Sequence, residues 1–235
     1  MTQLPLPLPP RVSYAAADFV PDASNEDALR WLAAPERWPG RRLLLAGPPG
    51  TGKTHLLRVV AAARGWEFRT GAALAGLPPL PEQGLALDEA DLPGEETALL
   101  HLMNACAEAG RPLLMAAPRP PSRWRVALPD LRSRLAATAV AMTSEPSDAL
   151  LEALFAKHLA DRQLALEPGL AAALRLRLPR SAAAIAEAVA RLERALPAPR
   201  GRLTRKAALA ALAPLLDDAL EKGSEAPGQP PGGLL

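Results

Sequence analysis

Eight consecutive residues, GPPGTGKT at positions 47–54, have the types and spacing that hold nucleotide phosphates. They fit the pattern G-x-x-x-x-G-K-[ST], in which glycines allow backbone N–H groups to close around phosphate oxygens. The ammonium of Lys53 would reach the β- and γ-phosphates, and the hydroxyl of Thr54 would bind Mg²⁺. The pattern predicts a site for ADP or ATP with Mg²⁺ made by Gly47, Pro48, Pro49, Gly50, Thr51, Gly52, Lys53 and Thr54.

An acidic pair, Asp88 and Glu89, ends the apolar run GLALDE. On its own, such a pair is more typical of solvated side chains at a strand end. Because it follows the phosphate loop by about 35 residues, we interpret it as the acidic motif of the same site. Asp88 would bind Mg²⁺, and Glu89 would polarise the attacking water.

Two arginines, Arg132 and Arg134, occur in the segment LPDLRSRLAATAVAM. Their spacing alone indicates surface residues on a short helix. An arginine supplied across an interface can instead accelerate phosphoryl transfer by about 10³–10⁵-fold. Both interpretations stay open on the residues alone.

The elements that must position these residues alternate along the first part of the chain. Buried parallel strands are expected where short apolar runs occur, and helices where apolar residues recur at helical spacing. The expected strands are 41–47, 66–70, 84–88, 112–117 and 137–142, and the expected helices are 22–38, capped by Ser24 or Asn25, 52–65, which stops at Gly65, and 95–110. This alternation predicts an α/β fold, a parallel sheet with helices on both faces.

From about Ser144 onward the pattern becomes entirely helical, over 147–163, 167–178, 181–196 and 204–216. Start signals and intervening Pro or Gly residues indicate separate helices of a small second domain. We therefore expect an extended tail at 1–12, a nucleotide-binding α/β domain at 13–144, a helical domain at 145–220 and a disordered Pro/Gly-rich tail at 221–235.

The composition argues against a membrane span, since no uncharged apolar run reaches 18 residues. The single cysteine, Cys106, cannot form an internal disulfide, and no signal peptide is recognisable, so we expect a cytoplasmic protein. Residues 111–206 carry 17 Lys/Arg against 8 Asp/Glu. Most of these side chains would cover a solvated helical surface, although a DNA-binding module remains an alternative.

Three segments, GKTHLL, PRPPSRW and LPDLRSRL, together resemble the DnaA-related AAA+ family, which includes the bacterial replication initiator DnaA and the shorter Hda-type regulators. The likeness runs from about residue 14 to residue 215. It implies an AAA+ P-loop NTPase domain followed by a helical lid. It also implies that the segment containing Phe19 and Val20 packs near the adenine, and that Arg134 is the arginine supplied in trans.

The opening segment QLPLPL, residues 3–8, resembles the sliding-clamp-binding peptide at the start of Hda-type proteins. Alternating prolines keep such a segment extended, so that Gln3 can make a polar contact while Leu4, Leu6 and Leu8 enter an apolar pocket. Prolines also reduce the entropy lost on docking. The resemblance implies that the DNA polymerase sliding clamp is a partner.

Two departures from the family pattern concern hydrolysis. The fourth strand ends with Ala116 and Ala117, where the family usually has a polar residue that helps to position water. The lid arginine expected at the nucleotide aligns with Ala183, and Arg180 is its candidate substitute. Because Glu89 is nevertheless present, we expect tight nucleotide binding with slow intrinsic hydrolysis.

The resemblance implies a regulator of chromosomal replication that binds the DNA-loaded clamp and stimulates ATP hydrolysis by DnaA, preventing re-initiation. The expected location is the cytoplasm, with the nucleoid and replisome. The alternative is a self-sufficient AAA+ ATPase that loads or remodels a replication component on DNA. The sequence leaves open whether the chain contacts DNA directly or through the clamp complex, and whether it forms a homo-oligomer.

Overall fold

The computed structural model describes residues 20–166, 168–196 and 203–224. It divides into two compact units, of which the first ends at Leu150 and the second begins at Leu151. The predicted clamp-binding residues Gln3, Leu4, Leu6 and Leu8 lie outside the described residues, as does Phe19.

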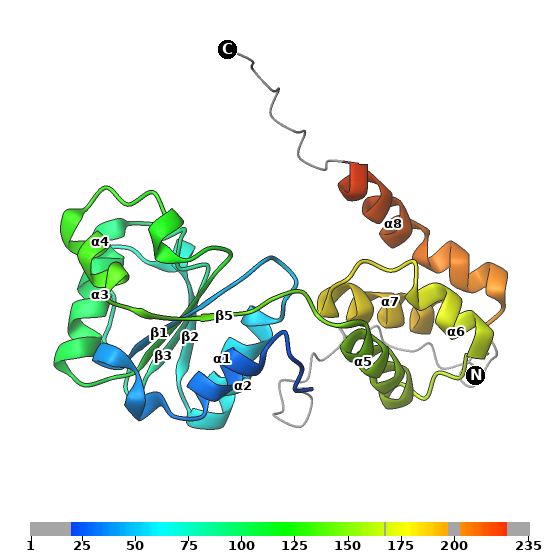
Figure 1. Ribbon diagram of the computed structural model, residues 1–235, viewed down its shortest axis with the longest axis horizontal. Coiled ribbons are helices and arrows are strands. Elements are labelled where there is room, and N and C mark those ends of the chain that lie inside the picture. The colour runs from blue at the N-terminus through cyan, green and yellow to red at the C-terminus, as the bar shows by residue number, and fades with distance from the viewer. Residues whose placement is uncertain (1–19, 167, 197–202, 225–235) are drawn as a thin grey trace, which may run out of the picture. The chain divides into compact units, whose positions relative to one another are not determined.

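The first unit is built on a sheet of five parallel strands in the order β2-β3-β4-β1-β5 (Figure 1). The strands are β1 (Arg42–Ala46), β2 (Glu67–Thr70), β3 (Leu85–Asp88), β4 (Leu113–Ala117) and β5 (Ala139–Met142), which confirms the five predicted strands. Leu44 of β1 pairs with Met115 of β4 and with Val140 of β5. Since all pairs are parallel, the carboxyl ends of all five strands lie along one edge.

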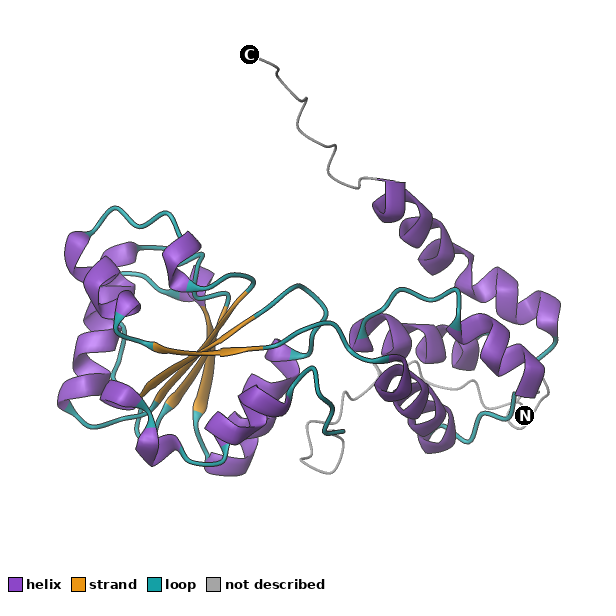
Figure 2. Cartoon of the chain, viewed as in Figure 1, coloured by secondary structure: helices purple, strands orange, loops and turns teal. Residues whose placement is uncertain are grey.

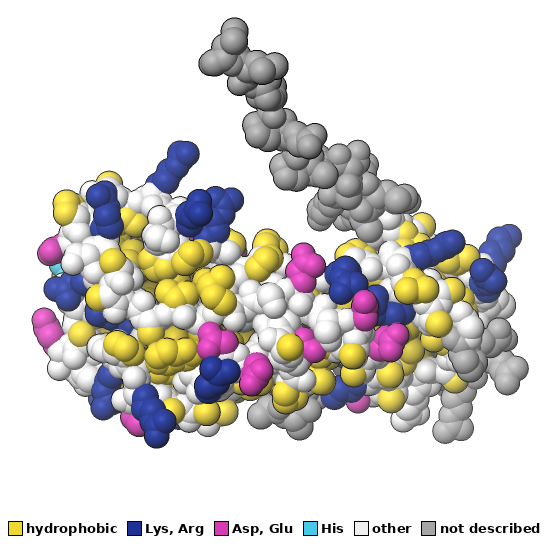
Figure 3. All heavy atoms as spheres, viewed as in Figure 1, with side chains coloured by type: hydrophobic (Ala, Val, Ile, Leu, Met, Phe, Trp, Pro, Cys, Tyr) yellow, Lys and Arg dark blue, Asp and Glu magenta, His cyan; other side chains and the backbone are white. Residues whose placement is uncertain are grey.

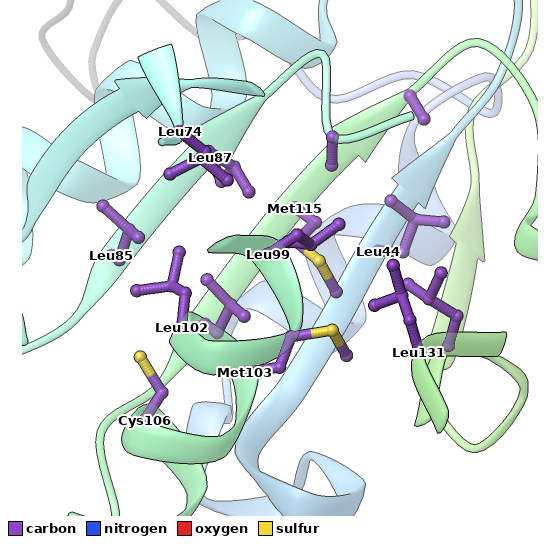
Figure 4. Close-up of a cluster of buried hydrophobic side chains, with 14 of the residues drawn as sticks. Leu44, Leu74, Leu85, Leu87, Leu99, Leu102, Met103, Cys106, Met115 and Leu131 are labelled. Atoms are coloured by element: carbon purple, nitrogen blue, oxygen red, sulfur yellow. The ribbon is translucent and has the colours of Figure 1, made fainter. Parts of the chain in front are cut away.

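Helices cover both faces of this sheet. Helices α1 (Glu26–Leu32) and α2 (Lys53–Arg64) pack on one face, and α3 (Glu96–Glu108) and α4 (Pro129–Ala136) on the other (Figure 1). Alternate strand residues serve the two layers: Leu44 and Met115 belong to the α3–α4 layer, in which Figure 4 shows Met115 beside Leu99 and Leu44 beside Leu131. Leu43 and Leu114 belong to the α1–α2 layer. Short 3₁₀ turns occupy Pro35–Arg37, Pro39–Arg41, Gly71–Ala73 and Pro121–Arg123.

The ends of α1 and α2 differ in how well the sequence predicts them. Helix α2 ends as expected at Gly65, whose left-handed φ of 64° suits glycine. Asn25 is the residue that precedes α1, but its side chain does not cap the helix. Its amide instead accepts from the backbone N–H of Asp22 (3.0 Å) and donates to the carbonyl of Val20 (3.2 Å). The predicted capping by Ser24 or Asn25 is therefore wrong, because the preceding loop uses these side chains.

All regular structure described beyond β5 is helical, as Figure 2 shows in purple. The helices are α5 (Asp148–Asp161), α6 (Pro168–Arg175), α7 (Ala182–Arg194) and α8 (Arg205–Ser224). Buried side chains of the second unit include Phe155, Leu174, Ile185, Val189 and Leu212. Among the described residues, no helix is both long and apolar enough to span a membrane.

Helix α8 extends further than the sequence predicts. It continues past Pro214 to Ser224, so residues 221–224, expected in a disordered tail, are helical. The residues after Pro214 include Leu, Ala, Glu and Lys, which are strong helix formers, and this composition favours continuation. The rest of the predicted tail lies outside the described residues.

Candidate functional site

The phosphate loop connects the carboxyl end of β1 to the first turn of α2 at the carboxyl edge of the sheet. Gly47 lies so close to the chain after β5 that a Cβ atom there would be 2.2 Å from the carbonyl oxygen of Thr143. Gly52, the residue before α2, has a φ of 87°, which side-chain-bearing residues rarely adopt. The sequence thus folds into a tight loop that leads directly into a helix N-terminus, where anions bind favourably.

The Lys53 side chain is folded into this loop. It is buried, and its Nζ donates to the carbonyl oxygens of Gly47 (2.6 Å) and Pro48 (2.7 Å). Burial lowers the pKa of Lys53, while the charges of Asp88 and Asp91 oppose that shift. The ammonium therefore lies in a polar cradle whose carbonyl contacts phosphate oxygens could replace.

Thr143, one residue beyond β5, supports the loop from the neighbouring strand. Its hydroxyl lies 2.8 Å from that of Thr51, and its N–H donates to the carbonyl of Ala46 (2.7 Å). Sequence reasoning missed this residue, since a threonine after a strand carries no distinctive signal. Its position beside the end of β1 depends on the strand order.

Asp88 ends β3 at the same edge, next to an exposed Glu89. The Asp88 carboxylate accepts the N–H of Glu89 (3.0 Å), and Glu89 has a φ of 52°. The Thr54 side chain is exposed at the start of α2. A carboxylate and a free hydroxyl are oxygen ligands suited to Mg²⁺, so Asp88 and Thr54 fit that ion.

Asp91 belongs to this region as well. Sequence analysis gave it no role, yet its charge acts on Lys53, and its Oδ1 is buried without a hydrogen-bond partner in the described structure.

Ala116 and Ala117 are the last residues of β4 and are buried. Their methyl groups can bind no water, but their backbone carbonyls connect the two motifs. The Ala116 carbonyl accepts the N–H of Ala90 (2.9 Å), and the Ala117 carbonyl accepts the N–H of Gly47 (3.3 Å). The fourth strand therefore fixes the acidic turn beside the phosphate loop.

The segment after Val20 is attached to the start of α5 through Asp22. Ser147 Oγ donates to Asp22 Oδ1 (2.5 Å), and Ser24 Oγ donates to Asp22 Oδ2 (2.6 Å). These hydrogen bonds, that from Ser147 most strongly, lower the pKa of Asp22 to about 2. Ser147 Oγ in turn accepts the N–H of Leu150 (3.1 Å) in α5.

Arg180, the predicted lid substitute, is exposed in the second unit. It immediately precedes Ser181, whose hydroxyl caps α7 by accepting the N–H of Ala184 (3.1 Å).

The two predicted arginines of α4 have different surroundings. Arg132 is exposed, and its Nη2 donates to the carbonyl of Val126 (2.6 Å). Arg134 is half-buried, and its buried Nε has no hydrogen-bond partner among the described residues. Arg134 precedes β5 by one turn, so it lies toward the amino edge of the sheet, and the phosphate loop is at the carboxyl edge.

The sequence matches no protein-family profile, and no curated protein sequence is similar to it. Solved structures are similar in fold. Domain III of the Thermotoga maritima replication initiation protein DnaA superposes with a TM-score of 0.70 at 19% identity, covering 90% of this chain and 99% of that one. AMPPCP-bound DnaA from Aquifex aeolicus superposes with a TM-score of 0.59 at 18% identity, covering 75% of this chain and 64% of that one. The T. maritima RuvB Holliday junction branch migration motor superposes with a TM-score of 0.63 at 20% identity, covering 86% of this chain and 72% of that one. The chain therefore shares the fold of these domains.

Proposed function

We propose that this chain is a nucleotide-binding AAA+ regulator of replication initiation, of the Hda type. It binds the DNA-loaded sliding clamp through residues 3–8 and supplies Arg134 to ATP held by the initiator DnaA. Hydrolysis of the initiator's ATP then prevents re-initiation. The fold shared with DnaA domain III supports the AAA+ part of this proposal.

The observation that carries the proposal is the contrast between Arg134 and Arg132. The Arg132 guanidinium already donates to the Val126 carbonyl, whereas the buried Nε of Arg134 has no hydrogen-bond partner among the described residues. Strand β1 separates the amino edge from the phosphate loop by about 13 Å, since its five residues are joined by four steps of about 3.3 Å each. An arginine at that distance is poorly placed for the chain's own nucleotide and is available to a partner's.

The phosphate loop would hold this chain's own ADP or ATP. Loop N–H groups and Lys53 bind the phosphates, and Thr54 with Asp88 holds Mg²⁺, which neutralises phosphate charge. Glu89 orients water, but Ala117 offers no side-chain hydrogen bond to help it. Tight binding with slow turnover follows, so nucleotide would serve chiefly to maintain the conformation that meets the partner.

The alternative is a self-sufficient AAA+ ATPase, and the exposed Glu89 beside Asp88 favours it. A DNA-binding module has less support, since basic side chains are spread over the displayed face of the first unit (Figure 3).

ATP turnover by the protein alone, and then with clamp, DNA and initiator, separates these functions. We expect slow turnover alone and rapid loss of initiator-bound ATP only when the clamp is loaded on DNA. Turnover by this chain that is fast alone and unchanged by the initiator would instead establish the self-sufficient ATPase.

A further inference from the structure

Arg42, the first residue of β1, is a buried cation with no counter-charge among the described residues. It is 9% exposed, and both its Nε and Nη1 lack hydrogen-bond partners within residues 20–166, 168–196 and 203–224. Its guanidinium folds back against Gly40, where a Cβ atom would be 3.1 Å from Nη2. An unpaired buried charge is unfavourable for folding, so its presence requires an explanation.

Arg134 is the charged neighbour of Arg42. Leu43 of β1 pairs with Ala139 of β5, and Thr138, just before β5, donates through Oγ1 to the carbonyl of Arg134 (3.0 Å). Burial lowers the pKa of Arg42, and the positive charge of Arg134 lowers it further. No carboxylate among the described residues offsets these two effects.

The two guanidiniums are exposed to different extents. Arg42 is buried, whereas Arg134 is half-buried with only its Nε both enclosed and unpaired. An anion that contacts the outer end of Arg134 would therefore also feel the charge of Arg42 across a region of low dielectric constant, where Coulomb interactions are strong. Binding of that anion would relieve the repulsion between the two cations.

We propose that Arg42 is a positioning residue that acts through Arg134, and that the pair binds a phosphate oxyanion. The anion is the terminal phosphate of a nucleotide carried by the partner AAA+ chain, and this assignment rests on the proposed function. Arg134 makes the contact, and the charge of Arg42 strengthens it from behind, because no carboxylate among the described residues offsets the charge of Arg42. The repulsion in the free protein is relieved when the partner's phosphate arrives.

Pyrophosphate tests the anion site in this chain alone. We would use Lys53→Ala as background, to weaken the phosphate loop, and measure the rise in Tm that pyrophosphate causes. The rise should be present in this background, lost when Arg42→Met or Arg134→Ala is added, and retained with Arg41→Met, a matched control at an exposed position. No rise in the background, or an equal rise with Arg42→Met, would overturn the pair as an anion site.

The stability of the free protein provides a second measurement. Without pyrophosphate, Arg42→Met should leave Tm unchanged or raise it, because an uncompensated buried charge is removed. A marked fall in Tm would show that Arg42 serves the fold and would overturn the proposal.

Single-turnover hydrolysis of initiator-bound ATP tests the role of Arg42 toward the partner. Arg42→Met should reduce the stimulated rate about tenfold while clamp binding is kept. Arg42→Lys should restore part of the rate, and this rescue should fall as pH rises, since burial lowers a lysine pKa. Full stimulation by Arg42→Met would overturn the inference.

Two further outcomes separate this inference from the proposed function. If the wild type does not stimulate ATP hydrolysis by the initiator, the proposed function is wrong. The assignment of the anion to the partner's nucleotide is then also wrong, even if pyrophosphate binding identifies an anion site. If Arg42→Met weakens binding to duplex DNA in the absence of initiator, the anion is the DNA backbone, and the nucleotide assignment is overturned.

Discussion

At the scale of single residues, Lys53 has a desolvated charge whose shortest hydrogen bonds go to loop carbonyls, with the Thr51 hydroxyl as a longer third acceptor. Phosphate oxygens are stronger acceptors for an ammonium than these carbonyls. We therefore expect Lys53→Ala to weaken ADP binding about 100-fold, as measured by isothermal titration calorimetry. Lys206→Ala, at an exposed position of α8, should leave the affinity unchanged. If Lys53→Ala binds ADP with the wild-type affinity, the phosphate loop is not the nucleotide-binding site.

Some residues of the candidate sites can be identified from the sequence, and others only from the structure. Residues 47–54 form a contiguous pattern with a strand before and a helix after it, so local sequence suffices to predict the loop. Thr143 and Arg42 carry no pattern, since their importance arises from neighbours brought by strand order. Strand order is a tertiary property, which explains why sequence reasoning did not identify either residue.

At the scale of elements, Asp22 attaches the N-terminal segment to the start of α5. Its pKa is lowered from 3.8 to about 2, so the folded state favours the carboxylate. The contribution of the ionised Asp22 carboxylate to the free energy of unfolding is therefore fully present above pH 3.8 and is lost as the pH falls toward 2.

Asp22→Asn should therefore have a lower urea midpoint than the wild type at pH 7. The difference should shrink across the range from pH 3.8 to about 2. Glu82→Gln, which removes a carboxylate at an exposed loop position, is the matched control and should keep the wild-type urea midpoint at pH 7. If the difference in urea midpoint between the wild type and Asp22→Asn stays constant through the acid range, the stabilisation does not come from the ionised carboxylate of Asp22.

The predicted clamp-binding segment gives a second test at this scale. Gln3→Ala combined with Leu6→Ala should abolish binding to the sliding clamp, because it removes one polar and one apolar contact. Tm should stay nearly unchanged, since the segment is expected to be exposed. Surface plasmon resonance with immobilised clamp measures the first effect and thermal denaturation the second. Normal clamp binding by the double variant would refute this function for residues 3–8.

Helix ends illustrate what element-level patterns miss. Apolar periodicity predicted α2 and its stop at Gly65, because both depend on nearby residues. The cap of α1 was mispredicted, since Asn25 hydrogen-bonds the preceding loop instead. The predicted last helix, 204–216, already included Pro214, but the extension of α8 from residue 217 to Ser224 was missed.

At the scale of the whole molecule, alternation of strands and helices predicted the parallel sheet, which the structure confirms with the strand order β2-β3-β4-β1-β5. The common direction of the strands separates the two chemical features of the first unit. The phosphate loop follows the carboxyl end of β1, whereas Arg42 and Arg134 lie toward the amino end of that strand. One chain can thus hold its own nucleotide at one edge while offering positive charge to another chain at the opposite edge.

The most direct test of this division compares Arg134→Ala with Arg132→Ala in single-turnover hydrolysis of initiator-bound ATP, with loaded clamp and each variant in excess. A guanidinium that stabilises charge developing on the partner's γ-phosphate affects rate more than assembly. Arg134→Ala should keep nucleotide and clamp binding but lose stimulation by about 10²-fold or more, and Arg132→Ala should have a smaller effect. Full stimulation by Arg134→Ala would contradict the account, and loss confined to Arg132→Ala would transfer the role to that residue.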